Sequence, residues 1–170
     1  MMLAIALLLA SAGLSAEPAA KPLTFEGRAG DLMILQLWSD KPDEILTEWN
    51  KPTPPNLRTT TKIERNKRIT AFIIFAGCKA DASGKCNLQG NVEFRDPDGQ
   101  IYGEQKDIDV WSGPPIDGYN LRMSPVSPAM IIEDGEKLGD YTVRITITDR
   151  NADVTATTEE RLTVVEAVAN

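Results

Sequence analysis

The chain contains no histidine and only two cysteines among its 170 residues, and aromatic residues make up 6% of it. Histidine is a common general base and zinc ligand, so its absence excludes Ser-His-Asp and Cys-His catalysis and most zinc sites. Basic residues are outnumbered, with 18 Lys and Arg against 25 Asp and Glu and a formal charge of −7. This acidic balance argues against nucleic-acid binding that depends on neutralising phosphates.

Long hydrophobic runs are also missing, apart from an uncharged, mostly apolar run over residues 1–14. It is shorter than the roughly 20 residues of a transmembrane helix, so no membrane span is expected. Its length, with small residues at Ser15 and Ala16, predicts a secretory signal peptide over 1–16, followed by a Pro/Ala linker over 17–22. The alternative is a buried N-terminal helix or strand. We expect export to the periplasm, or alternatively to the extracellular space.

The expected export predicts the state of the two cysteines, because thiol pairs in exported proteins usually form disulfides. Cys78 and Cys86 flank a short polar stretch in which Gly84 is placed for a turn. A disulfide closing this loop is predicted. The alternative is a reactive thiol pair, which only the neighbouring Lys79 and Lys85 would favour. Two cysteines without histidine do not complete a zinc shell, and no metal or other cofactor is expected.

Strand patterns dominate the rest of the chain. Residues 141–148 and 88–95 alternate apolar and polar residues, which is typical of half-buried strands. Residues 69–75 are almost continuously apolar, which indicates the centre of a sheet. Asp96-Pro97-Asp98-Gly99 predicts a tight turn rather than a calcium loop, with a partner strand at 100–103. Weaker strand patterns lie at 32–38, 107–111, 119–123, 129–132 and 161–165. Short strands at this spacing predict an antiparallel sandwich or a barrel.

Residues 138–149 carry a resemblance to a known fold family. Gly139 and Tyr141 look like the Gly-x-Tyr corner of immunoglobulin-like domains, in which the tyrosine hydroxyl bonds the backbone upstream. Val143 stands where an antibody domain carries its second inter-sheet cysteine. With the Asp-Pro-Asp-Gly turn and the closing Leu162-x-Val164, the pattern is similar to bacterial immunoglobulin-like and macroglobulin-like modules. Residues 75–86 also resemble uncharacterised exported bacterial proteins. The resemblance implies an all-β, antiparallel immunoglobulin-like β-sandwich with a binding or spacer role.

One short helix interrupts this all-β pattern near the N-terminus. Residues 42–49 place acidic residues in a first turn, Ser39 and Asp40 can cap it, and prolines over 52–55 end it. The expected organisation is a single domain over 23–166, with an insertion at 41–66, an immunoglobulin-like core at 68–166 and a tail at 167–170. We expect a monomer.

Two groups of residues are candidate binding surfaces. The first is a basic stretch formed by Arg58, Lys62, Arg65, Lys67 and Arg68. It could face phosphates, lipid headgroups or an acidic protein, or it could be a solvated strand edge that resists aggregation. The second is aromatic: Trp111 and Tyr119 flank a Pro/Gly loop, and Trp49 precedes the prolines. These rings could stack on sugars or peptides, or Trp38, Trp49 and Trp111 could fill the core.

Catalytic arrangements are weaker in this sequence, and no catalytic residue is expected. Asp107 and Asp109 flank Ile108 on a predicted strand, so they should share a face, as the two acids of a glycosidase could. Ser83 and Lys85 could form a dyad without histidine. The expected function is a non-catalytic accessory or interaction module that binds a protein or envelope polymer. The alternatives are a carbohydrate-binding module, a small periplasmic inhibitor or chaperone, and a carboxylate-dependent hydrolase.

Overall fold

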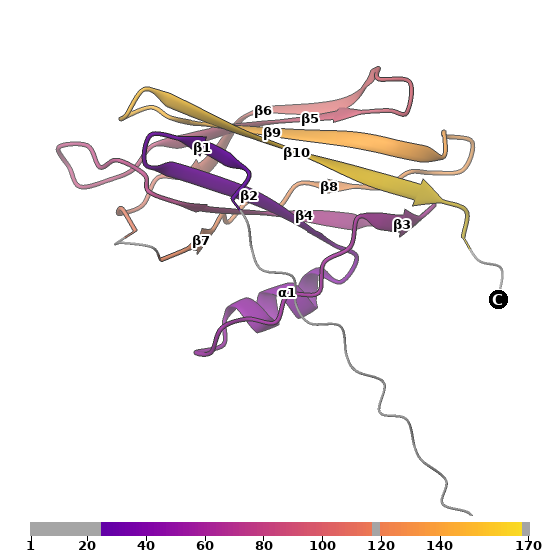
Figure 1. Ribbon diagram of the computed structural model, residues 1–170, viewed down its shortest axis with the longest axis horizontal. Coiled ribbons are helices and arrows are strands. Elements are labelled where there is room, and N and C mark those ends of the chain that lie inside the picture. Colours follow the sequence, from indigo (N-terminus) through magenta and orange to yellow (C-terminus); the bar gives the residue numbers. More distant parts are fainter. Residues whose placement is uncertain (1–24, 117–119, 168–170) are drawn as a thin grey trace, which may run out of the picture.

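The computed structural model describes residues 25–116 and 120–167, which form two β-sheets packed face to face (Figure 1). The elements in chain order are β1 (Gly27–Ala29), β2 (Leu32–Ser39), α1 (Pro42–Trp49), β3 (Lys62–Glu64), β4 (Ile69–Ala76), β5 (Leu88–Arg95), β6 (Ile101–Trp111), β7 (Arg122–Met123), β8 (Ala129–Met130), β9 (Gly139–Asp149) and β10 (Val154–Val165). The predicted signal peptide at 1–16 and linker at 17–22 lie outside the described residues. Within those residues, no helix is long and apolar enough to cross a membrane.

The strand order identifies the type of sandwich. The first sheet runs β1-β2-β4-β7, with β8 also paired to β4, and the second runs β3-β10-β9-β5-β6. Every pair is antiparallel except β3 with β10, which is parallel. Strands β4, β5, β9 and β10 take the B, C, F and G positions of the immunoglobulin fold. The protein is therefore an all-β, antiparallel immunoglobulin-like β-sandwich, which confirms the predicted fold class.

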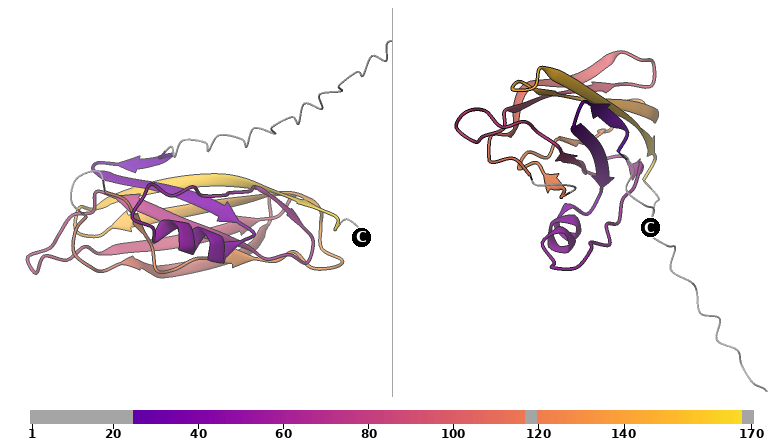
Figure 2. Two further views of the ribbon diagram at one scale, coloured as in Figure 1. Left: turned by 90° about the horizontal axis from the view of Figure 1, so that it is seen from below. Right: turned by 60° about the vertical axis from the view of Figure 1, so that its left-hand side comes forward.

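The core lies between the sheets and is built from alternate residues of each strand. On β9, the inward row is Tyr141, Val143, Ile145 and Ile147, and all four are buried. Strand β4 is buried at every position because both of its faces are covered. Figures 1 and 2 place α1 on the outer side of the β2–β4 sheet. This double burial explains the continuous apolar run that marked 69–75 as a sheet centre.

A buried polar contact joins the sheets near the position of the missing inter-sheet disulfide. The side-chain amide of Gln36 on β2 donates to the carbonyl oxygen of Val143 on β9 at 3.2 Å. The Trp38 indole donates to the Gln36 amide oxygen at 3.0 Å, and its ring packs edge-on against Phe94. The Gln36 amide and the Trp38 indole therefore both have hydrogen-bond partners inside the core.

Several strand boundaries differ from the prediction. Strand β6 is one continuous strand over Ile101–Trp111, whereas the sequence predicted two, because β-bulges let it continue past its charged centre. Strand β10 begins at Val154 instead of 161, because Thr and Glu side chains hide the pattern of its first half. Strands β7 and β8 are shorter than predicted. Helix α1 has its predicted bounds, but its N-cap is Lys41 and no side chain caps it.

Candidate functional site

The predicted disulfide is present and holds a compact loop at one end of the sandwich. Cys78 and Cys86 are bonded, with their Cα atoms 5.9 Å apart. Inside the loop, Asp81 Oδ1 accepts hydrogen bonds from the backbone N–H groups of Ser83 and Lys85 at 2.8 and 3.0 Å. These bonds, that of Lys85 first, lower the pKa of the Asp81 carboxyl. The Ser83 hydroxyl also donates to Asp81, so it serves the turn and does not face Lys85 as a nucleophile.

The five residues of the predicted basic surface do not lie together. The Arg65 side chain is only 14% exposed and bonds Glu166 Oε1 at 2.8 Å and the main-chain oxygen of Glu136. Arg58 lies in a separate pocket beside α1. Lys62, Lys67 and Arg68 are exposed and line one groove. In the structure, Arg65 is therefore mostly buried, Arg58 lies in the pocket beside α1, and only Lys62, Lys67 and Arg68 share a groove.

This groove, called the cationic groove below, has a volume of about 650 Å³ and lies along β3. It is lined by Asp40, Lys41, Thr60, Lys62, Ile63, Glu64, Lys67, Arg68 and Val165. Four of these side chains are basic and two are acidic, so the lining carries a net charge of about +2 in a chain of −7. Asp40 and Lys41 were not predicted to belong to this surface, because the α1 insertion brings them next to β3.

Three basic side chains of the groove have no ion-pair partner within residues 25–116 and 120–167. Among the described residues, Lys62, Lys67 and Arg68 form no side-chain ion pair. The fourth basic side chain of the groove, Lys41, pairs with Glu44. Most basic side chains outside the groove are also paired with acids, at Lys51, Arg65, Arg95, Lys106, Lys137, Arg144, Arg150 and Arg161. Three neighbouring basic side chains without such pairs favour anions, so the groove is the candidate site.

Local hydrogen bonds occupy much of the outward edge of β3. The Thr60 hydroxyl donates to the Lys62 carbonyl at 2.9 Å and accepts from the Lys62 N–H at 3.1 Å. The Glu64 carbonyl accepts the N–H of Lys67 at 3.1 Å. Because these three backbone groups already have partners, the edge favours recognition by side chains over β-augmentation.

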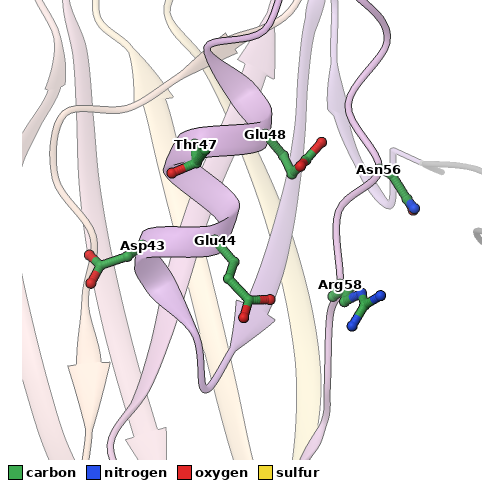
Figure 3. A pocket seen from close by; sticks show the side chains of 6 residues that line it. All are labelled: Asp43, Glu44, Thr47, Glu48, Asn56 and Arg58. Carbon is green, nitrogen blue, oxygen red and sulfur yellow. The ribbon is translucent and has the colours of Figure 1, made fainter.

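A second pocket, of about 430 Å³, lies between α1 and the segment that follows it. Figure 3 shows Glu44 and Glu48 of α1 facing the segment that carries Asn56 and Arg58. Two of its three acids are paired locally: Glu44 pairs with Lys41, and Glu48 pairs with Lys51, whose hydrogen bond lowers the pKa of the Glu48 carboxyl. Charges that neutralise each other leave little for a ligand, so this pocket is the weaker candidate.

The aromatic surface is only partly described. Trp111 is half-buried, its indole donates to the Pro114 carbonyl at 2.9 Å, and the Arg122 guanidinium lies 4.8 Å from the ring centroid. Trp49 is half-buried at the end of α1, and Tyr119 lies outside the described residues. The Arg122 guanidinium therefore covers part of the Trp111 ring face on which a sugar would stack. The carbohydrate-binding alternative stays a prediction.

The two acids on β6 have different partners. Asp107 has a positive φ of 54° and sits at a β-bulge, which interrupts the alternation that placed it beside Asp109. Asp107 lies 3.7 Å from Arg150, whereas Asp109 accepts a hydrogen bond from the Ser112 hydroxyl at 3.3 Å. Neither carboxylate lines the cationic groove or the α1 pocket.

The end of the sandwich nearest the groove is held by a hydrogen-bond network. The Tyr141 hydroxyl donates to the Lys137 carbonyl at 2.9 Å, which is the upstream backbone contact that the Gly139–Tyr141 resemblance implies. Tyr102 donates to the Ile131 carbonyl at 3.1 Å and bonds Glu136. Burial, together with the Glu136 bond, raises the Tyr102 pKa to about 12. These contacts fix the loop before β9.

Comparison with known proteins leaves the function open. No protein-family model and no curated protein sequence matches the chain. Among solved structures, a CARDB domain from Pyrococcus furiosus in complex with di-metal ions is 14% identical, covering 88% of this chain and 98% of that one, with a TM-score of 0.44. A family 123 glycoside hydrolase from Clostridium perfringens is 8% identical, covering 82% of this chain and 28% of the hydrolase, with a TM-score of 0.47. A Niemann-Pick type C2 protein from the Japanese carpenter ant is 10% identical, covering 84% and 100%, with a TM-score of 0.41. Similarities this low carry no conclusion about activity.

Proposed function

We propose that the protein is an exported, non-catalytic interaction module that binds an anionic partner, either a protein or an envelope polymer, through the cationic groove. The observation that carries this proposal is the clustering of Lys62, Lys67 and Arg68, unpaired among the described residues, around one hollow of an acidic protein. An anion that enters the groove can pair with these three side chains, which have no ion-pair partner among the described residues.

The physical basis is electrostatic attraction between exposed groups. Lys62, Lys67 and Arg68 are exposed, so their interaction with a ligand is screened by salt over about 10 Å at 0.1 M ionic strength. Binding should therefore weaken as salt is added, and the association rate should fall with it. A partner recognised mainly by apolar contact would not show this dependence.

Export is supported by two independent features. The signal-peptide pattern over 1–16 predicts passage through a secretory pathway. The Cys78–Cys86 disulfide fits an oxidising compartment, where such bonds persist. We place the mature protein in the periplasm. Mass spectrometry of the secreted chain should find it beginning at Ala16 or Glu17, and a chain that keeps Met1 would contradict export.

A non-catalytic role fits the way in which the polar side chains are used. The candidate catalytic groups have other partners: Asp107 lies near Arg150, Asp109 bonds Ser112, and Ser83 bonds Asp81. A general acid or base needs a perturbed, positioned group facing a reacting atom. The groove instead offers exposed basic side chains suited to binding.

The test is a binding measurement with a matched control. A variant with Lys62→Gln, Lys67→Gln and Arg68→Gln removes three unpaired charges from the groove. The control, Arg28→Gln, Lys79→Gln and Lys85→Gln, removes the same charge from side chains elsewhere that also lack an ion pair among the described residues. Polyglutamate, alginate and polyphosphate serve as probes at low salt.

We expect wild-type protein and the control to bind at least one probe, and the groove variant to bind it about tenfold more weakly, since exposed charge pairs contribute about 0.2–1 kcal/mol each. Equal losses in both variants would mean that net charge alone attracts the probe. That result, or no binding by the wild type, would overturn the proposal.

A further inference from the structure

We infer that the anionic partner is an acidic polypeptide segment in an extended conformation, rather than a uniformly charged polymer. This inference rests on the proposed function and concerns the same cationic groove. It follows from the acidic and apolar groups that share the groove with the lysines and the arginine.

The groove lining also contains acidic side chains. Asp40 and Glu64 are among its residues, and neither forms an ion pair within the described part of the chain. A polymer with a negative charge on every repeat and few donors brings like charges next to both carboxylates, which disfavours it. A peptide carries amide N–H groups between its acidic side chains, and a carboxylate accepts such donors well.

The groove lining also has an accessible apolar side chain. Val165 is half-buried beside the basic side chains, whereas Ile63 is 3% exposed and packs in the core between the sheets. Basic side chains together with an accessible valine match a chain that presents acidic and apolar side chains in alternation. An extended peptide does so, because its successive side chains point to opposite sides.

The backbone of β3 favours a peptide that is held by its side chains. The Lys62 N–H and carbonyl and the Glu64 carbonyl are already bonded to Thr60 and Lys67, which disfavours addition of the peptide as another strand. In this arrangement its acidic side chains contact Lys62, Lys67 and Arg68 directly. Replacing glutamate by glutamine in the peptide should therefore abolish most of the binding, although the backbone is unchanged.

The experiment compares an acidic peptide with a polyphosphate of equal charge and with an uncharged peptide of the same length. Fluorescence anisotropy at neutral pH and low salt would follow a labelled peptide of alternating glutamate and valine. Its competitors would be the glutamine–valine peptide and a polyphosphate with the same number of charges. Wild-type protein should bind the acidic peptide about tenfold more tightly than polyphosphate, and the glutamine peptide should not compete.

A second variant tests the acidic members of the groove. The double variant Asp40→Asn, Glu64→Gln removes the repulsion between these carboxylates and polyphosphate. Its affinity for polyphosphate should therefore rise several-fold, and the ratio of peptide affinity to polyphosphate affinity should fall. Asp31→Asn with Asp153→Asn, which removes two charges on turns outside the groove lining, should leave the preference unchanged.

The outcomes separate this inference from the proposed function. If polyphosphate binds wild-type protein as tightly as the acidic peptide does, and loses affinity in the Lys62, Lys67 and Arg68 variant, the groove binds anions but the polypeptide inference is wrong. If no anionic probe binds, or the groove variant binds each probe as the wild type does, the proposed function fails too.

Discussion

Two regions of the chain carry basic side chains without ion pairs, and they are built differently. In the disulfide loop, residues 77–87, the backbone is tied at both ends: Asn151 Nδ2 donates to the carbonyls of Lys79 and Lys85, both at 2.9 Å. In the basic segment, residues 58–68, Lys62, Lys67 and Arg68 surround a groove. The loop presents isolated charges, whereas the segment gathers them around a hollow.

This difference separates scaffold from binding surface. Buried or part-buried polar groups that satisfy one another stabilise the fold, and removing one leaves others unpaired. Exposed charges without partners contribute little to folding and remain available to a ligand. Substitutions in the loop should therefore change stability, and substitutions in the groove should change binding.

The largest expected effect is at Asp149, which anchors the loop. Its side chain is 1% exposed and accepts backbone hydrogen bonds from Lys79 at 2.7 Å, Asn151 at 3.0 Å and Ala152 at 3.2 Å. Asp149→Ala leaves three donors without an acceptor and should lower the free energy of unfolding by about 3 kcal/mol. Urea denaturation measures this, with exposed Asp109→Ala as the control. A change no larger than the control's would show that water replaces the carboxylate.

The next effect is at the disulfide. Replacing Cys78 and Cys86 by alanine removes a constraint on the unfolded chain that is worth about 2.6 kcal/mol for a ring of this size. Urea denaturation measures this loss of stability. Wild-type protein should lose stability only when reductant is present, whereas the variant should be less stable with and without reductant. Anion binding at the groove should survive below the transition. Loss of binding in the folded variant would contradict the separation of the two regions.

A smaller effect should appear inside the basic segment itself. Arg65→Gln removes a mostly buried guanidinium from Glu166 and the Glu136 carbonyl, and should cost about 1.5 kcal/mol of stability. Lys67→Gln, only two positions away, should change stability by less than about 0.5 kcal/mol. Thermal and urea unfolding of the two variants test this contrast. Equal losses would mean that the segment acts as one structural unit.

These neighbouring residues also show how far the sequence could predict the molecule. Period-two alternation identified β5 and β9 because their inward rows are strongly apolar. It could not separate Arg65 from Lys67, because which of them turns inward depends on Glu166, far along the chain. Nor could it place Asp40 beside β3, since that neighbourhood is created by the α1 insertion. Contacts between distant segments leave no local pattern.

The smallest effect on stability should come from the groove variant with glutamine at Lys62, Lys67 and Arg68. Two effects oppose each other: removing neighbouring like charges relieves local repulsion, and removing positive charge from a chain of −7 increases overall repulsion. The control variant with glutamine at Arg28, Lys79 and Lys85 undergoes only the second effect. The groove variant should therefore be slightly more stable than the control, with both within about 0.5 kcal/mol of wild type.

Urea denaturation at low and high salt measures this difference, which should shrink as salt screens the local repulsion. A loss of more than about 1 kcal/mol in the groove variant alone would mean that these side chains stabilise the fold. A groove variant that is no less stable than the control would mean that these charges do not stabilise the fold. The sign of this small difference therefore tests whether the groove charges serve folding, and the binding measurement tests whether they serve a ligand.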